Sequence, residues 1–92
     1  MLMDFETSIV DFIKSIVFDL NLPEDVSLQL LEYAQHSECG MAFEDLVYYI
    51  ENNELGMKKE TFEKIVKLGH MLDMEEKSWE ALKRLVTFAG KQ

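Results

Sequence analysis

Apolar side chains recur with helical spacing along almost the whole chain, and this periodicity constrains the fold more than any other feature. The clearest stripe follows an i, i+3, i+4, i+7 pattern and consists of Ile9, Phe12, Ile13, Ile16, Val17 and Leu20. No segment alternates apolar and polar residues with the period of two that marks a half-buried strand. The 92 residues are too few for two domains that each bury a core. We therefore expect an all-α, compact single-domain bundle of about five short helices over residues 1–92, without a sheet.

Proline and glycine divide this pattern into segments. A second helix is expected to carry Pro23 in its first turn, and Gly40 is placed to end it. A third helix is expected to begin near Met41 and to stop within ENNELG, where Gly56 is the breaker. The side chains predicted to face the core from the second to the fifth helix are Val26, Leu30, Leu31, Ala34, Ala42, Phe43, Leu46, Val47, Ile50, Phe62, Ile65, Val66, Gly69, Leu72, Trp79, Leu82, Val86 and Ala89.

The stretch DMEEKSW indicates the start of the fifth helix. Asp73 is placed to accept hydrogen bonds from the N–H groups of the first turn, while Glu76 reaches back. This helix is expected to end at Gly90. Gly69 lies inside the fourth helix, where glycine costs about 1 kcal/mol relative to alanine. We therefore expect a close contact between helices at Gly69.

Charge is distributed unevenly along the chain. The formal net charge is −9, yet residues 1–57 hold twelve acidic residues against Lys14 alone, and residues 58–92 hold eight basic and six acidic residues. A strongly anionic surface repels nucleic acid and membrane headgroups, so we expect neither as a direct partner. The same surface attracts a basic protein, or a metal ion if carboxylates converge. Solubility alone would explain the sign of the charge, and the asymmetry weakens this explanation relative to that of a partner.

The residue types needed for catalysis or for a metal site do not occur at suitable spacings. A zinc site requires several cysteine or histidine ligands at set spacings. No further cysteine or histidine lies near His36, Glu38 and Cys39. Adjacent carboxylates on a helix point about 100° apart and do not share one site. The chain has no nucleophile beside a base and no glycine-rich phosphate loop. We therefore expect no enzyme, no cofactor and no metal.

The composition predicts a cytoplasmic protein. Asp4 and Glu6 stand where a secretory signal carries lysine or arginine. No stretch approaches the ~18 apolar residues that a membrane span needs. Cys39 is the only cysteine and cannot form an internal disulfide, which suits a reducing compartment.

Tyr48 and Tyr49 lie among carboxylates in the third predicted helix. The apolar residues of this helix fall within an arc of roughly 140°, and Tyr48 lies nearly opposite the centre of that arc. Tyr49 lies at its shoulder, where a side chain is half buried. Glu44 and Asp45 flank Tyr48 on the far side. An exposed tyrosine surrounded by carboxylates is typical of a hot spot for a basic partner.

Phe18, in the first helix, also points away from the apolar stripe, beside Asp11 and Lys14. It is expected either to contact a partner or to pack against the end of another helix. The full set of residues predicted to bind a partner is Glu38, Glu44, Asp45, Tyr48, Tyr49, Glu51, Asn52 and Phe18.

A spaced pattern extends over more than half of the chain. It begins with His-x-Glu-x-Gly-x-Ala-x-Glu and continues with an acidic turn, a Lys-Glu-x-Phe helix, a Leu-Gly pair and a late tryptophan. Its positions are His36, Glu38, Gly40, Ala42, Glu44, Leu46, Glu60, Phe62, Leu68, Gly69, Leu72, Asp73, Trp79, Leu82 and Leu85. In this pattern residues 36–86 resemble the MafI-type immunity proteins of bacterial toxin–immunity systems.

The resemblance implies a small helical cytosolic protein that neutralises the C-terminal domain of a secreted or contact-delivered polymorphic toxin. Such toxin domains are often nucleases, and EndoU-like RNases are among the partners of the family. The expected function is stoichiometric occlusion of a basic nuclease by the acidic face. Three alternatives stay open: a colicin-type immunity protein, a small acidic adaptor or regulator of a basic host protein, and a carboxylate metal-binding protein. The sequence does not determine the oligomeric state.

Overall fold

The computed structural model describes the backbone of residues 5–87 and the side chains of residues 8–87. Within that range the chain forms five α-helices and a short 3-10 helix. The α-helices are α1 (Phe5–Leu20), α2 (Glu24–Gln35), α3 (Cys39–Asn52), α4 (Lys59–Met71) and α5 (Lys77–Glu80), and the 3-10 helix η1 spans Ala81–Leu85. The prediction of an all-α bundle of about five short helices is confirmed.

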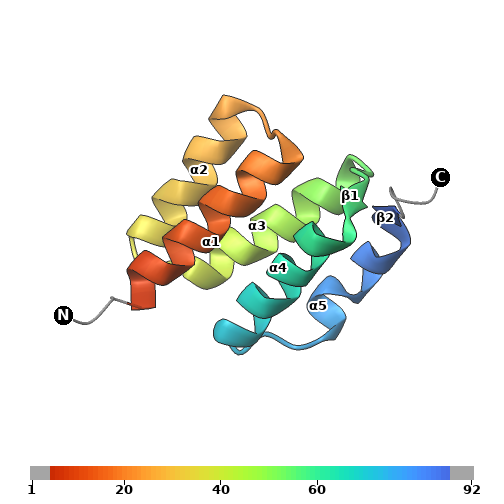
Figure 1. Ribbon diagram of the computed structural model, residues 1–92. Coiled ribbons are helices and arrows are strands. Elements are labelled where there is room, and N and C mark those ends of the chain that lie inside the picture. Colours follow the sequence, from red (N-terminus) through yellow and green to blue (C-terminus); the bar gives the residue numbers. More distant parts are fainter. Residues whose placement is uncertain (1–4, 88–92) are drawn as a thin grey trace.

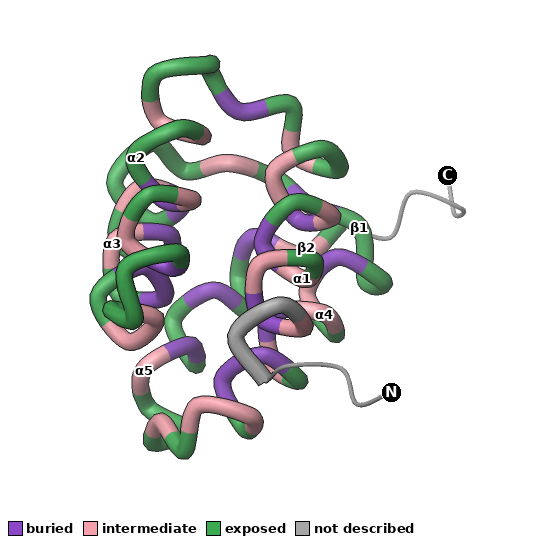
Figure 2. Tube along the Cα trace, turned by 90° about the vertical axis from the view of Figure 1, so that its left-hand side faces the viewer, coloured by how far each residue is buried: buried purple, intermediate pink, exposed green. Residues whose placement is uncertain are grey.

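The helices pack in two layers around one core. Figure 1 shows α1 and α4 side by side in front of α2 and α3, and Figure 2 shows the two pairs edge-on, with buried residues between them. Burial of apolar surface between the layers is the main stabilising contribution to such a bundle. The buried apolar residues are Ile9, Ile13, Ile16, Leu22, Leu30, Ala34, Ala42, Phe43, Leu46, Val47, Ile50, Met57, Ile65, Leu68, Trp79, Leu82 and Leu85.

A two-stranded parallel sheet corrects the expectation of a sheet-free fold. Strand β1 (Met57–Lys58) pairs with β2 (Val86–Thr87), and Met57 lies opposite Val86. The hydroxyl of Thr87 also donates to the carbonyl oxygen of Met57, at 3.2 Å. The β-branched residues Val86 and Thr87 favour extended backbone, so the fifth helix does not continue through Val86. Ala89 and Gly90, predicted to belong to that helix, lie outside the described residues.

Four residues other than glycine end the first four helices. Asn21, Ser37, Glu54 and Asp73 have φ between 50° and 64°, and no described glycine has a positive φ. In each case the next N–H group bonds to the carbonyl oxygen five residues earlier, as from Leu22 to Val17 or from Met74 to Gly69. These bonds are those of the Schellman motif and satisfy carbonyl groups at the helix ends.

These helix ends correct several sequence predictions. Gly40 does not close α2 but lies in the first turn of α3, and the left-handed residue after α2 is Ser37. Helix α3 does stop within ENNELG, although Glu54 makes the turn that was assigned to Gly56. Asp73 ends α4, and no side-chain hydrogen bond caps α5. Pro23 precedes α2 by one residue instead of lying in its first turn.

Gly69 meets Trp79, as the expected close contact between helices requires. A Cβ atom built on Gly69 would overlap the Trp79 ring and lie 3.2 Å from Cζ of Phe43. The Trp79 ring packs edge-on against Phe43, with the ring centroids 6.1 Å apart, and against His70, at 5.2 Å. Trp79 therefore packs between α3 and α4 at the position of Gly69, where α4 has no side chain.

Replacing Gly69 with alanine should destabilise the protein by about 1–3 kcal/mol, because the added methyl group displaces the Trp79 ring. Gly40→Ala is the matched control, since a Cβ there has no neighbouring atom within 4 Å. Alanine's higher helix propensity should make that variant equal to or more stable than the wild type. Urea unfolding measures both, and a Gly69→Ala variant as stable as the wild type would contradict the packing described.

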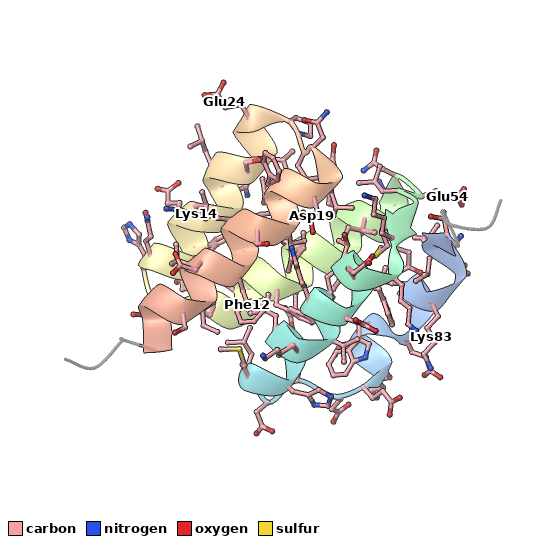
Figure 3. The ribbon with its side chains drawn as sticks, in the orientation of Figure 1. Phe12, Lys14, Asp19, Glu24, Glu54 and Lys83 are labelled. Carbon is pink, nitrogen blue, oxygen red and sulfur yellow. The ribbon has the colours of Figure 1, made fainter. Side chains whose placement is uncertain are left out.

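Asp19 links α1 to α4. Its carboxylate accepts hydrogen bonds from the Lys64 ammonium group at 2.7 Å and from the Thr61 hydroxyl at 3.1 Å. Lys64 also donates to the Ser15 hydroxyl at 2.6 Å. Figure 3 shows Asp19 and Phe12 on the side of α1 that faces α4. The hydrogen bond from Lys64, aided by Thr61, lowers the pKa of Asp19 below its ordinary value, against partial desolvation that raises it.

The lowered pKa predicts a small acid-dependent contribution to stability. A carboxyl group whose pKa is lower in the folded than in the unfolded state stabilises the fold. The effect is complete above its pKa in the unfolded state, about 3.9, and is lost as the pH falls through its pKa in the folded state. Asp19→Asn should therefore cost up to about 1 kcal/mol at neutral pH, because the pair with Lys64 is partly exposed. Thermal unfolding from pH 7 to pH 2 measures the melting temperature of both proteins. The difference in melting temperature between Asp19→Asn and wild type should shrink below pH 4. Asp11→Asn, on the exposed side of α1, is the control, and an equal effect there would contradict the assignment.

Candidate partner-binding surface

Residues 24–52, which form α2, α3 and the turn between them, carry seven carboxylates and no lysine or arginine. The acidic residues of this stretch are Glu24, Asp25, Glu32, Glu38, Glu44, Asp45 and Glu51. All are exposed except Asp45, which is half buried. The charge asymmetry along the sequence therefore becomes an asymmetry between the two layers, since α4 carries Lys59, Lys64 and Lys67. We call the solvent-facing side of α2 and α3, residues 24–52, the acidic layer.

Tyr48 lies on the exposed side of α3, beside α5. Its side chain is 68% exposed, as the helical spacing predicts. It borders a hollow of ≈240 Å³ that Glu44 and Glu51 also line, together with Ser78 from α5. Phe43 and Val47 form the floor of this hollow from the core side of α3. The hollow therefore combines an apolar base, an aromatic wall and two carboxylates.

The other predicted residues of α3 lie around Tyr48 in different degrees of exposure. Asp45 and Tyr49 are half buried, and Tyr49 packs against the core. Glu51 and Asn52 are exposed at the end of the helix, and Glu38 is exposed just before its start. All seven residues predicted between positions 38 and 52 therefore lie on or beside α3.

Phe18 does not join this group. It is 84% exposed, but it belongs to α1 in the other layer. The buried residues of α1 face the core from the opposite side of that helix (Figure 2). One partner surface laid over the acidic layer would not reach Phe18.

A second hollow, on α2, was missed in the sequence. It measures ≈610 Å³ and is lined by Asp25, Leu28, Gln29, Glu32, Tyr33, His36 and Glu38. Leu28 is 58% exposed and Met41, at the start of α3, is 47% exposed. Among residues 8–87, three of the four large exposed apolar side chains, including Tyr48, thus lie on α2 and α3. The available signal was that Leu28 and Met41 fall off the core stripes of their helices.

The carboxylates of the acidic layer form no ion pair with a described side chain. Among the described side chains the ion pairs are Lys64–Asp19, Lys77–Glu75 and Arg84–Glu54, and none involves residues 24–52. The field of these carboxylates therefore extends into solvent, where it attracts cations and basic proteins. Exposed apolar side chains beside them supply area that a partner can bury.

The described part of the chain offers little for other chemistry. Within residues 8–87, no three histidine, cysteine, aspartate or glutamate side chains are grouped to hold a metal ion. None of the described helices is long and apolar enough to cross a membrane. The Cys39 thiol is half buried and donates to the carbonyl oxygen of Ala34 at 3.7 Å.

No protein-family model, curated protein or solved structure matches this chain. Its function must be inferred from its residues and from the acidic layer.

Proposed function

We propose that this protein is an immunity protein that binds a basic toxin domain, a nuclease, through the acidic layer. One observation carries the proposal: residues 24–52 gather seven carboxylates, no lysine or arginine, and three large exposed apolar side chains on one layer. A charge excess that served solubility alone would not need these apolar groups beside it. The resemblance of residues 36–86 to MafI-type immunity proteins supports the same function.

The physical basis is complementarity to a surface that binds nucleic acid. A nuclease needs positive charge to hold the phosphate backbone, and this charge attracts an acidic protein at long range. Tyr48 then supplies contact area at low cost in side-chain entropy, while Glu44 and Glu51 align the two surfaces. Inhibition is stoichiometric, because the bound protein covers or overhangs the substrate groove. No catalytic group of this chain takes part. EndoU-like RNases fit this description among the candidate toxins.

A small acidic adaptor of a basic host protein would use the same surface, so the partner must be identified directly. The test is to co-express the protein with the C-terminal toxin domain encoded immediately upstream of its gene. The proposal predicts that this domain alone stops growth, that co-expression restores it, and that the two proteins purify as a stable complex. A harmless upstream domain, or one that does not bind, would contradict the immunity function and favour the adaptor.

Tyr48→Ala should weaken binding of the partner by about 2 kcal/mol, because a central aromatic contact is lost. The fold should stay intact, since the side chain is mostly exposed. Phe18→Ala is the matched control, as it removes an even more exposed aromatic ring from the other layer. Calorimetric titration measures the affinity of each variant for the partner. Equal affinities for Tyr48→Ala and wild type would remove Tyr48 from the interface.

Reversing two charges beside Tyr48 should slow association. Glu44→Lys combined with Asp45→Lys removes two negative charges and adds two positive ones, so the association rate constant should fall by roughly tenfold at low salt. The difference should shrink at high salt, where screening is stronger. Asp11→Lys with Glu60→Lys makes the same change of charge on the layer of α1 and α4 and is the control. Stopped-flow rates that are independent of salt for the wild type would refute electrostatic steering.

A further inference from the structure

Helix α4 presents an apolar hollow on the layer opposite the acidic layer. It measures ≈690 Å³ and is lined by Phe62, Glu63, Val66, Lys67, His70 and Met71. Phe62, Val66 and His70 follow one another at intervals of four residues, so they form a continuous ridge along one side of the helix. Phe62, Val66 and Met71 are each only half buried by the protein's own fold. The lining of this depression is mostly apolar, and the proposed function does not use it.

The hollow contains one acidic and one basic side chain, Glu63 and Lys67. Glu63 and Lys67 are one helical turn apart, and neither forms an ion pair with another described side chain. The Lys67 ammonium group instead lies over the Phe12 ring, 5.7 Å from its centroid. The hollow therefore offers one unpaired carboxylate and one ammonium group beside an apolar ridge. Unlike the acidic layer, it carries no excess of negative charge that would repel a second copy.

We propose that this α4 surface binds a second copy of the same chain, with the two α4 helices antiparallel. A two-fold axis reverses one helix relative to the other, so an axis close to Val66 places Glu63 of each copy near Lys67 of its partner. The two Val66 side chains then meet at the centre, and Phe62 of each copy packs toward the His70 end of the other helix. The α4 surface of one copy therefore matches the α4 surface of the other, in its apolar groups and in its charges.

The size of the surface sets the strength of this dimer. Thirteen residues of α4 span about 20 Å, so a single helix pair buries less than a standard stable interface. Each copy also carries a net charge of −9, which opposes association. The dimer should therefore be weak, with a dissociation constant on the order of 0.1 mM. Because the acidic layer lies on the other pair of helices, each copy can still bind its basic partner.

Sedimentation equilibrium of the full chain tests the dimer at concentrations from roughly 10 µM to 1 mM, in enough salt to screen the net charge. Lys67→Glu should weaken dimerisation by about tenfold or more, because it places like charges across the two-fold axis. Glu63→Lys should do the same, and the double variant Glu63→Lys, Lys67→Glu should restore association by re-forming opposite pairs.

Lys14→Glu is the control, because it makes the same change of charge on the side of α1 away from α4 (Figure 3). Circular dichroism should show that each variant keeps the helical content of the wild type, since all three residues are exposed. A wild-type protein that stays monomeric over the whole range would overturn the proposal. So would a dimer that Lys67→Glu and Lys14→Glu weaken equally, or a double variant that associates no better than the single ones.

Discussion

The contact between Trp79 and Gly69 is the interaction on which the rest of this small structure depends. Helix α5 and η1 together contain only nine residues, too few to form stable helices alone in water. They are held in place because the Trp79 ring enters the space left by Gly69 and packs against Phe43. This anchor also places Ser78 beside the hollow of Tyr48 and directs β2 toward β1. Core packing thereby shapes one wall of the candidate binding surface.

The two layers give the molecule two chemically different surfaces. The acidic layer combines uncompensated carboxylates with Leu28, Met41 and Tyr48, and this combination suits a basic partner with some apolar contact area. The layer of α1 and α4 instead neutralises part of its own charge, as in the pair between Asp19 and Lys64. Its hollow around Val66 is apolar and nearly balanced in charge. Segregation of charge by layer allows two binding events that do not compete for the same surface.

Local periodicity predicts most of this fold, whereas features set by tertiary contacts are missed. The stripes of α1 to α4 identify buried residues such as Ile13 and Leu46, and the same geometry predicts that Tyr48 is exposed. The pairing of β1 with β2 joins segments about thirty residues apart and leaves no pattern in either. Glycine is the usual left-handed residue at a helix end, yet residues such as Glu54 take that role because the surrounding bonds impose it. Helical periodicity places Leu28 off the core stripe of α2, but the shape of the hollow beside it depends on side-chain packing.

The most direct test of the central claim is carboxyl footprinting of the complex with the upstream toxin domain. Carbodiimide labelling followed by mass spectrometry measures the accessibility of each aspartate and glutamate with and without the partner. Partner binding through the acidic layer predicts strong protection of Asp25, Glu32, Glu44 and Glu51, with unchanged labelling of Glu60 and Glu63 on α4. Protection of Glu60 and Glu63 with unchanged labelling of α2 and α3 would show that the partner binds the opposite layer and would contradict the account.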